Sequence, residues 1–516
     1  MDATVPQGSP GGRTSFAGFV IFVGIFLAVL MGGMDALVVS TALPTIATDL
    51  HQANGITFVV GAYIIASTVA IPVFARLSDS MSRRNLFVIG LLVFIAGSML
   101  AGLSTSLPEL IAFRAVQGFG IGGLFPVAIA MVAVLYPRET RSRMTAALTG
   151  AAGISIVGGP LLGSYILDVT TWRWVFYINL PIGVASLLIL ALGAGALRPA
   201  RSLRFDVVGA ATLGAWVGSL MFALVQVSEA GWAWSDPRVV GLLAFAAVAF
   251  VAFFLWELRV PDPLVPIRML RRRILAASGG SALFNGAVLN SALTFLSVYV
   301  GVVLFHGGPD APDMVRDMIY FFALPMITGA ALSAPLLERF SYRVVVAGGL
   351  ALGAVSCLFL TDLTVSTPLW VLRYGFLPTG GVVVPLIPMG LGLGLALAGT
   401  TIAVQNEVPE SEVGSAVGLV RFLQSLGGAV GLSLLTAYQV WRKAALSSAA
   451  KSPADLASAL ITSYDEVFVA LVGVLVIAFL FALFFTGRLS RRAEAGAESS
   501  PAEPGRSAVL SDPRDP

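Results

Sequence analysis

Charged residues are scarce in this chain of 516 residues, and their scarcity limits the class of protein. Asp, Glu, Lys and Arg make up 11% of the sequence, whereas hydrophobic residues make up 57%. A typical soluble domain has roughly 25% charged residues. A soluble chain of this length could not bury so much apolar surface in one core, and disorder requires low hydrophobicity. The composition therefore indicates a polytopic membrane protein.

Cysteine and histidine are also rare. The single Cys357 excludes an internal disulfide, and its apolar surroundings predict a buried, inert thiol. His51 and His306 fall in separate predicted loops, so we expect no metal site. Glycine-rich stretches at 118–123 and 390–394 lie inside apolar segments, which excludes a dinucleotide fingerprint, and no phosphate loop occurs. We therefore expect no cofactor. A net charge of +3 is too even for a nucleic-acid-binding protein.

Long apolar segments dominate the sequence. A helix needs about 20 apolar residues to cross the hydrocarbon core of a bilayer. We predict an all-α protein with about fourteen transmembrane helices, over residues 16–43, 56–75, 86–107, 110–135, 144–167, 174–197, 207–228, 239–256, 274–305, 318–337, 344–361, 374–406, 413–441 and 467–487. The first helix is expected to end before Pro44, and the twelfth to be kinked by Pro378, Pro385 and Pro388.

Basic residues alternate between the two sides of these segments. Of the 31 Lys and Arg residues, 22 fall on the side of the N-terminus and 7 on the other side, while Arg114 and Arg421 lie inside apolar segments. Because cytoplasmic loops are enriched in Lys and Arg, we predict a multi-pass protein of the cytoplasmic membrane with both termini in the cytoplasm.

Two basic loops resemble each other and suggest an internal repeat. Residues 75–84 and 334–343 share Ala, Leu, an acid, Ser and Arg in register, 259 residues apart. Repeated halves that meet at a central cavity are typical of transporters. We predict a flexible cytoplasmic tail, an N-terminal six-helix half, an inserted helix pair, a C-terminal six-helix half and a disordered cytoplasmic tail, at residues 1–15, 16–197, 198–273, 274–487 and 488–516.

Asp35 is an acid well inside an apolar segment. A charge at the bilayer centre costs about 2.5–3.5 kcal/mol on insertion scales. A carboxyl that is ionised when wet and protonated when desolvated can carry a proton. The alternative is an acid that is hydrogen-bonded to a neighbouring helix.

Arg114 lies inside the fourth segment, on one helix face with Gly118, Gly122 and Pro126. These glycines permit close approach of another helix, so the arginine is predicted to point into the bundle and to act on an acid there. The alternative is an arginine that extends to the membrane interface.

Two further motifs have both a functional and a structural interpretation. The fifth segment carries Gly158, Gly159, Pro160 and Gly163, which predict a hinge or seal between halves, or ordinary tight packing. The loop 76–84 pairs Asp79 with several arginines. This cluster could hold one conformation of the protein closed, or serve topology alone.

These motifs resemble those of the major facilitator superfamily. Residues 158–163 resemble the fifth-helix motif of its antiporters, residues 114–122 its fourth-helix motif, and residues 75–84 its signature loop, from which Ala75, Ser80 and Ser82 depart. Residues 35–44 and 172–183 resemble the fourteen-span drug:proton antiporter family.

The resemblance implies a major facilitator fold and assigns roles to these residues. Asp35 would bind the proton and Arg114 would assist its exchange. Gly158, Gly159, Pro160 and Gly163 would form the antiporter motif. Asp79, Arg83 and Arg84 would form an inner gate.

Polar groups within or beside the apolar segments are candidates for substrate contact. An apolar cavity with a few polar groups suits drug-like ligands. For each candidate, a hydrogen bond between helices is an alternative. The candidates are Tyr63, Gln117, Asn179, Asn285 and Asn290.

We predict proton-coupled export of amphipathic drug-like compounds by alternating access. The expected partners are a small-molecule substrate, protons and membrane lipid, with no nucleic acid, and we expect a monomer. One alternative is a transporter of the same fold that takes up its substrate by symport or exports a lipid, amino acid or siderophore. A membrane enzyme would need clustered His, Asp or Cys near an interface, and none occurs. A channel fits poorly with repeated halves.

Overall fold

Helices form nearly all of the regular structure. The computed structural model describes residues 16–52, 55–56, 58–192, 206–228, 232–304, 311–361, 383–448 and 452–487, and no strand occurs among them. Thirteen described helices are long and apolar enough to cross a membrane, and a shorter apolar helix covers Tyr342–Leu358. Each of the fourteen predicted segments overlaps one of these helices, which confirms the all-α fold class.

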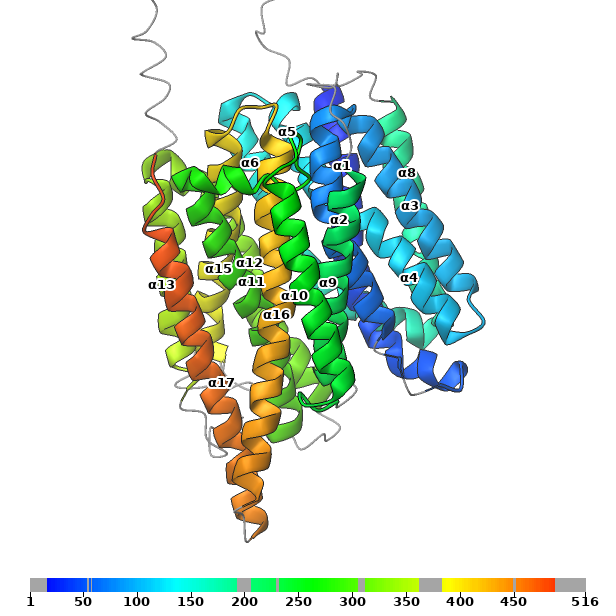
Figure 1. Cartoon of the computed structure of the whole chain (residues 1–516), viewed down its shortest axis with the longest axis vertical. Helices are drawn as coiled ribbons and strands as arrows, with labels where there is room; N and C mark the ends of the chain where they lie inside the picture. Colours follow the sequence, from blue (N-terminus) through cyan, green and yellow to red (C-terminus); the bar gives the residue numbers. More distant parts are fainter. Residues whose placement is uncertain are drawn as a thin grey trace, which may run out of the picture.

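The first part of the chain forms a set of helices that we call the N-terminal bundle (Figure 1). Its helices are α1 (Phe16–Asp49), α2 (Phe58–Ser80), α3 (Arg83–Leu103), α4 (Leu107–Gly122), α5 (Leu124–Leu135), α6 (Arg138–Val169), α7 (Trp174–Tyr177) and α8 (Asn179–Leu192). Helices α4 and α5 form one span that is interrupted at Gly123, and α7 and α8 form another.

The C-terminal bundle follows an inserted pair of helices. The pair consists of α9 (Val207–Ser228) and α10 (Pro237–Glu257), followed by a short 3-10 helix at Ile267–Arg271. The C-terminal bundle contains α11 (Arg273–Val298) with a π-helical end at Tyr299–Leu304, α12 (Ala311–Arg339), α13 (Tyr342–Leu358), α15 (Val383–Glu407), α16 (Val413–Ser447) and α17 (Pro453–Ala482).

The two bundles share one packing pattern. In the N-terminal bundle α1 packs on α6, α2 on α4, and α3 on α4; in the C-terminal bundle α11 packs on α16, α12 on α15, and α13 on α15. The bundles meet mainly along α2 with α16 and α6 with α12, and also along α6 with α15 and α5 with α16. This arrangement places the central seam of the molecule between two similarly built units.

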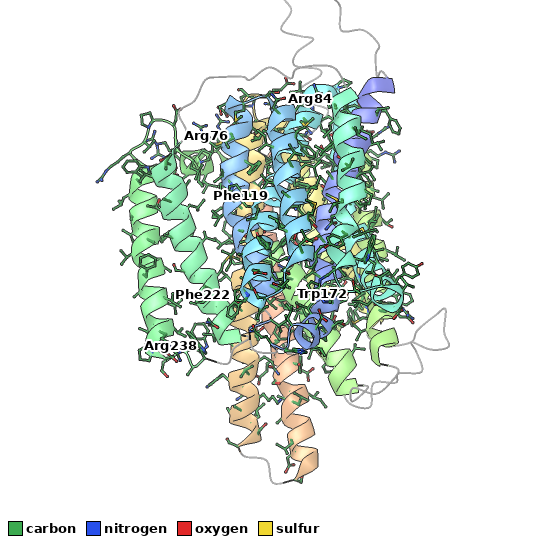
Figure 2. All side chains as sticks on the ribbon, turned by 90° about the vertical axis from the view of Figure 1, so that its right-hand side faces the viewer. Arg76, Arg84, Phe119, Trp172, Phe222 and Arg238 are labelled. Carbon is green, nitrogen blue, oxygen red and sulfur yellow. The ribbon has the colours of Figure 1, made fainter. Side chains whose placement is uncertain are left out.

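Helices α9 and α10 form a layer at the side of this seam (Figure 2). Helix α9 contacts both α2 and α16. Its Trp216 lies 5.7 Å from the ring of Phe253 on α10 and 6.1 Å from the ring of Phe422 on α16, measured between centroids. The segment after α10 is joined to α2 by Arg76, whose Nη2 lies 3.2 Å from Oδ1 of Asp262. The inserted pair therefore covers one side of the junction between the bundles.

Helix α1 is longer than the sequence predicts. The prediction that it ends before Pro44 is wrong, because α1 continues through this proline to Asp49. A proline inside a helix removes one hydrogen bond and bends the helix, which tertiary contacts can offset. Here Asp49 Oδ2 accepts hydrogen bonds from Trp172 Nε1 at 2.8 Å and from Arg173 Nη1 at 3.0 Å.

Helices α16 and α17 also exceed their predicted lengths and project beyond the other helices (Figure 1). The parts that the prediction leaves out, 442–447 and 453–466, contain charged residues that interrupt the apolar pattern. Arg442 and Glu466 join the two helices by an ion pair with an Nε–Oε2 distance of 2.7 Å. Tyr438 donates a hydrogen bond to the same carboxylate at 2.9 Å.

Some predictions concern residues that the structure does not describe. The tails 1–15 and 488–516, His306 and Pro378 lie outside the described residues. Pro388 lies inside α15, and Cys357 is buried as predicted.

Close approach of α3 and α4 requires glycine at the contact. A Cβ atom at Gly120 would lie 2.4 Å from the backbone nitrogen of Phe94 and 2.7 Å from the carbonyl oxygen of Gly90. Small residues at such contacts let two membrane helices pack backbone to backbone. The face of α4 that carries Gly120 is thus fixed against α3.

We predict that Gly120→Ala destabilises the protein. The added methyl group must push α3 away, and overpacking of this kind costs about 1–3 kcal/mol. Thermal unfolding in detergent should show a lowered midpoint. Gly241→Ala on α10 is the matched control, because nothing lies within 4 Å of a Cβ at that position. Equal midpoints for the two variants would contradict this account of the α3–α4 contact.

Candidate functional site

Asp35 lies near the middle of α1 and is 2% exposed. Its Oδ2 accepts a hydrogen bond from Arg114 Nη1 at 2.5 Å. Its Oδ1 accepts from Gln117 Nε2 at 2.8 Å and from Asn179 Nδ2 at 2.7 Å. All three neighbours donate, so the surroundings stabilise an ionised carboxylate.

Arg114 is fully buried and is held from several sides. Besides Asp35, it donates to Gln117 Oε1 at 2.7 Å and to the carbonyl oxygen of Val59 at 3.3 Å. Its guanidinium carbon lies 4.0 Å from the ring centroid of Tyr63 and 5.9 Å from that of Phe176. Its Nη2 is buried and has no hydrogen-bond partner among the described residues. The arginine therefore points into the bundle, as predicted, and does not extend to an interface.

Ser98 on α3 completes the group. Its Oγ accepts from Gln117 Nε2 at 3.1 Å and from Asn179 Nδ2 at 3.0 Å, and it donates to the carbonyl oxygen of Phe176 at 2.8 Å. We call Asp35, Arg114, Gln117, Asn179 and Ser98 the buried ion-pair cluster. It joins α1, α3, α4 and α8 within the N-terminal bundle.

Gln117 and Asn179 were predicted to contact substrate, but the structure places them in the buried ion-pair cluster. They are 0% and 3% exposed, and neither lines the cavity between the two bundles, which we call the central cavity. Their amide groups are used by Asp35 and Ser98, which explains why polar side chains occur in these apolar helices. Hydropathy could identify the two residues as unusual but could not identify their partners.

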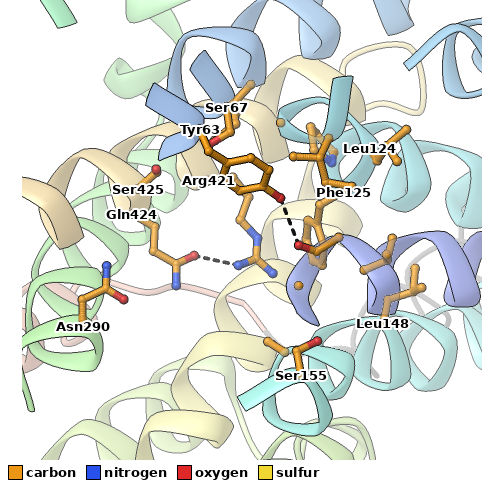
Figure 3. A pocket seen from close by; sticks show the side chains of 18 residues that line it. Tyr63, Ser67, Leu124, Phe125, Leu148, Ser155, Asn290, Arg421, Gln424 and Ser425 are labelled. Atoms are coloured by element: carbon orange, nitrogen blue, oxygen red, sulfur yellow. Dashed lines mark hydrogen bonds between the residues drawn. The ribbon is translucent and has the colours of Figure 1, made fainter. Parts of the chain in front are cut away.

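The central cavity between the two bundles has a volume of about 340 Å³ (Figure 3). Tyr63 and Asn290, both predicted to contact substrate, line it. Asn285 is buried on α11 and does not. Tyr63 donates a hydrogen bond to the carbonyl oxygen of Gly32 at 3.1 Å. Since its ring also covers Arg114, Tyr63 separates the buried ion-pair cluster from the cavity.

A second cavity of about 450 Å³ lies beside helix α9 of the inserted pair. Residues of α1, α2, α9, α11 and α16 line it, including Leu43, Ile64, Met221, Thr294 and Leu432. Its walls are mostly apolar. Both bundles and helix α9 thus contribute to the same space.

The antiporter-motif residues of α6 face α1 in the same bundle. A Cβ at Gly158 would lie 2.8 Å from Met34 Cε, one at Gly159 would lie 2.6 Å from Leu37 Cβ, and Gly163 faces Thr41. Pro160 lies inside α6. These glycines bring α6 onto α1 next to Asp35. A hinge role for the motif stays a prediction.

The end of the molecule that carries Arg76 and Arg84, here called the basic end, lies opposite the end that carries Trp172 and Arg238 (Figure 2). At the basic end, Asp79 Oδ2 accepts a short hydrogen bond from Ser415 of the C-terminal bundle. Arg83 Nη2 donates to the carbonyl oxygen of Glu410 at 2.7 Å. Asp79 and Arg83 thus connect the bundles.

Arg84 takes no part in this connection. Its Nη2 donates to the carbonyl oxygen of Ala191 at 3.0 Å, within the N-terminal bundle. The structure therefore places only two of the three predicted gate residues between the bundles. Arg84 follows Arg83 on α3, and adjacent residues point to different faces of a helix.

Sequence reasoning missed the partners on both sides of this connection. Arg141 Nη2 lies 2.8 Å from Glu410 Oε1, and Thr145 Oγ1 donates to Gln405 Oε1 at 2.6 Å. We call Asp79, Arg83, Arg141, Glu410 and Ser415 the basic-end latch. Glu410 lies 269 residues from Arg141 in the chain, and no spacing rule predicts such a pair.

Comparisons with known proteins identify relatives along most of the chain. The sequence model of the Major Facilitator Superfamily matches residues 22–432. The multidrug transporter protein MdtP of Bacillus subtilis is 28% identical over 418 residues, which cover 81% of this chain and 74% of that protein. The puromycin resistance protein pur8 of Streptomyces alboniger is 30% identical over 489 residues, which cover 93% and 94%.

A solved structure supports the same fold. The proton:xylose symporter XylE, bound to 6-bromo-6-deoxy-D-glucose, has a TM-score of 0.59 over 92% of this chain and 97% of its own. At 14% sequence identity, the likeness concerns the fold alone.

We predict that Arg141→Gln opens the basic end. The change removes an ion pair with Glu410; the Arg141 side chain is buried but that of Glu410 is 61% exposed, so the contact is worth about 1 kcal/mol. The population that is open at this end should rise about fivefold. The reporter is Ser142→Cys in a Cys357→Ser background, labelled with a polar maleimide. Ser142 is 1% exposed, so labelling should be slow until the latch opens.

Arg143→Gln is the matched control. Arg143 contacts Glu338 at 3.4 Å, and the side chains of both residues are largely exposed, at 62% and 43%. Exposed pairs contribute little, so this variant should label at the parent rate. If both variants accelerate labelling equally, Arg141 has no special part in closure.

Proposed function

This chain belongs to the major facilitator superfamily, and we propose that it exports amphipathic drug-like compounds across the cytoplasmic membrane in exchange for protons. The family and the fold are those of a transporter, not an enzyme. One observation carries the proposal: a buried carboxylate, Asp35, is paired with Arg114 directly behind the wall of the central cavity. Two relatives are named as a multidrug transporter protein and a puromycin resistance protein, and these names favour drug export.

The proposed orientation places the basic end in the cytoplasm. Most Lys and Arg residues fall on that side of the membrane segments, as the positive-inside rule requires. The described conformation is then closed toward the cytoplasm, because the basic-end latch connects the bundles there. Alternating access requires the two bundles to rock about the cavity, so that the latch opens when compounds enter from the cytoplasm. The protein works as a monomer embedded in lipid.

The buried ion-pair cluster supplies the proton site. In the described conformation Asp35 has three donors, which is the arrangement of an ionised carboxylate before it takes up a proton. Protonation removes the charge that attracts Arg114. Arg114 would then lose its main partner and shift against Tyr63.

Tyr63 links this event to the cavity. Its ring contacts Arg114 on one side, and its side chain lines the cavity on the other. A shift of Arg114 therefore changes the cavity wall. Proton binding and substrate binding would thereby favour opposite conformations, and a gradient of one pH unit would supply about 1.4 kcal/mol per proton.

We predict that Asp35→Asn abolishes transport driven by a pH gradient. The amide cannot be ionised, so the variant cannot exchange a proton at this position. Inside-out vesicles with an imposed gradient are given a panel of anionic, neutral and cationic amphipathic compounds. Each compound that dissipates the gradient with the wild type should have no such effect with the variant.

Asp49→Asn is the matched control on the same helix. Its carboxylate pairs with Arg173 and is half exposed, so its loss should leave coupled transport near the wild-type rate. The amount of inserted protein is measured for both variants. Gradient-driven transport by correctly inserted Asp35→Asn protein would refute the proton-site assignment.

A further inference from the structure

One residue that lines the central cavity has a positively charged side chain. Arg421 on α16 lines the cavity together with residues of α1, α2, α4, α5, α6 and α11. The other walls are mainly apolar and include Val29, Ile71, Ile121, Leu148 and Ala152. Arg421 is only partly buried, but an arginine within a membrane helix is costly and usually has a partner of opposite charge.

Arg421 has no acidic partner among the described residues. Its Nη1 donates to Gln424 Oε1 at 2.8 Å, and its guanidinium carbon lies 3.6 Å from the ring centroid of Phe125. Its Nε is buried without a hydrogen-bond partner in the described part of the chain. In contrast, Arg114 forms an ion pair with Asp35. The two intramembrane arginines therefore differ in whether the protein itself neutralises them.

No carboxylate in the described part of the chain lines the cavity. Its polar lining consists of Arg421 and the uncharged side chains of Tyr63, Ser67, Ser155, Asn290, Gln424 and Ser425. A cationic ligand would have to leave water without a countercharge and approach Arg421, which is unfavourable. An anionic group would meet a partly buried guanidinium that can donate hydrogen bonds.

We propose that this cavity selects amphipathic compounds that carry a carboxylate or sulfonate, which binds Arg421. The inference rests on the proposed function, which makes this cavity the transport site. The anionic group contacts the guanidinium of Arg421. It also lies beside the polar side chains of Gln424 and Asn290, which line the same cavity (Figure 3). Because Gln424 Oε1 accepts from Arg421, the amide nitrogen of Gln424 is left as a donor. The apolar body of the compound packs on the opposite wall.

Phe125 contributes to this selection. Its ring holds the guanidinium from one face by a cation–π contact. The edge of the guanidinium, which carries the N–H groups, stays available to a ligand. Aromatic rings of a ligand can pack beside Phe125. A flat aromatic compound with one anionic substituent therefore fits the cavity best.

Two probes with one ring system and opposite permanent charges test the proposal. They are naphthalene-2-sulfonate and trimethyl(2-naphthyl)ammonium, and their binding to the purified full chain is measured by calorimetry. The wild type should bind the sulfonate more tightly. Arg421→Gln should weaken sulfonate binding about tenfold or more without weakening ammonium binding, and Arg421→Lys should retain part of the preference.

Arg442→Gln is the control on the same helix. Arg442 lies outside the cavity and pairs with Glu466, so this variant should keep wild-type affinities. Thermal unfolding of every variant checks that the fold is retained. The proposal is overturned if the wild type prefers the ammonium or binds neither probe. It is also overturned if Arg421→Gln changes both affinities equally or changes neither.

This experiment separates the inference from the proposed function. Binding is measured without a membrane gradient, so it does not depend on proton coupling at Asp35. A sulfonate preference that is lost in Arg421→Gln would support the inference even if Asp35→Asn transported normally. A charge-indifferent cavity would refute the inference and leave proton-coupled export standing.

Discussion

The buried ion pair between Asp35 and Arg114 is the interaction on which the rest of the account depends. Two charges leave water at this position, and their mutual attraction offsets that cost only with good geometry and further hydrogen bonds. Gln117 and Asn179 supply those bonds, Ser98 accepts hydrogen bonds from both of their amides, and Tyr63 covers the arginine. Removing the carboxylate charge leaves a buried cation without its partner. Protonation of Asp35 would therefore change the contacts that Arg114 makes with the surrounding helices.

The buried ion-pair cluster and the contacts between the bundles are located in different parts of the molecule. The buried ion-pair cluster belongs entirely to the N-terminal bundle, whereas the cavity and the basic-end latch are shared by both bundles. The glycines of α6 let this helix pack closely on α1 beside Asp35, and the other face of α6 packs on α12. A change at Asp35 can thus reach the seam between the bundles by way of Tyr63 or α6. The second arginine, Arg421, reaches the same cavity from the C-terminal bundle.

The sequence predicted what depends on single residues and local pattern. Hydropathy located the thirteen described spans and the shorter helix at Tyr342–Leu358, and a charge within an apolar segment was enough to single out Asp35 and Arg114. Pairings between distant segments were not predictable, so Glu410 was missed, and for Gln117 and Asn179 the sequence left substrate contact and a hydrogen bond between helices as alternatives. The prediction from Pro44 was wrong because α1 continues through this proline to Asp49, whose carboxylate accepts a hydrogen bond from Trp172. The sequence showed Arg421 as an intramembrane charge, but only the structure shows that it has no acidic partner among the described residues.

The most direct test of the account is the distance between the bundles at the basic end as a function of pH. Spin labels at Met81 and Phe340 in a Cys357→Ser background occupy exposed, corresponding turns of the two bundles. Pulsed electron resonance reports their distance distribution. The account predicts that the distribution shifts with pH in the parent protein and is the same at every pH in Asp35→Asn. An undiminished shift in Asp35→Asn would contradict the claim that this carboxyl controls the conformation.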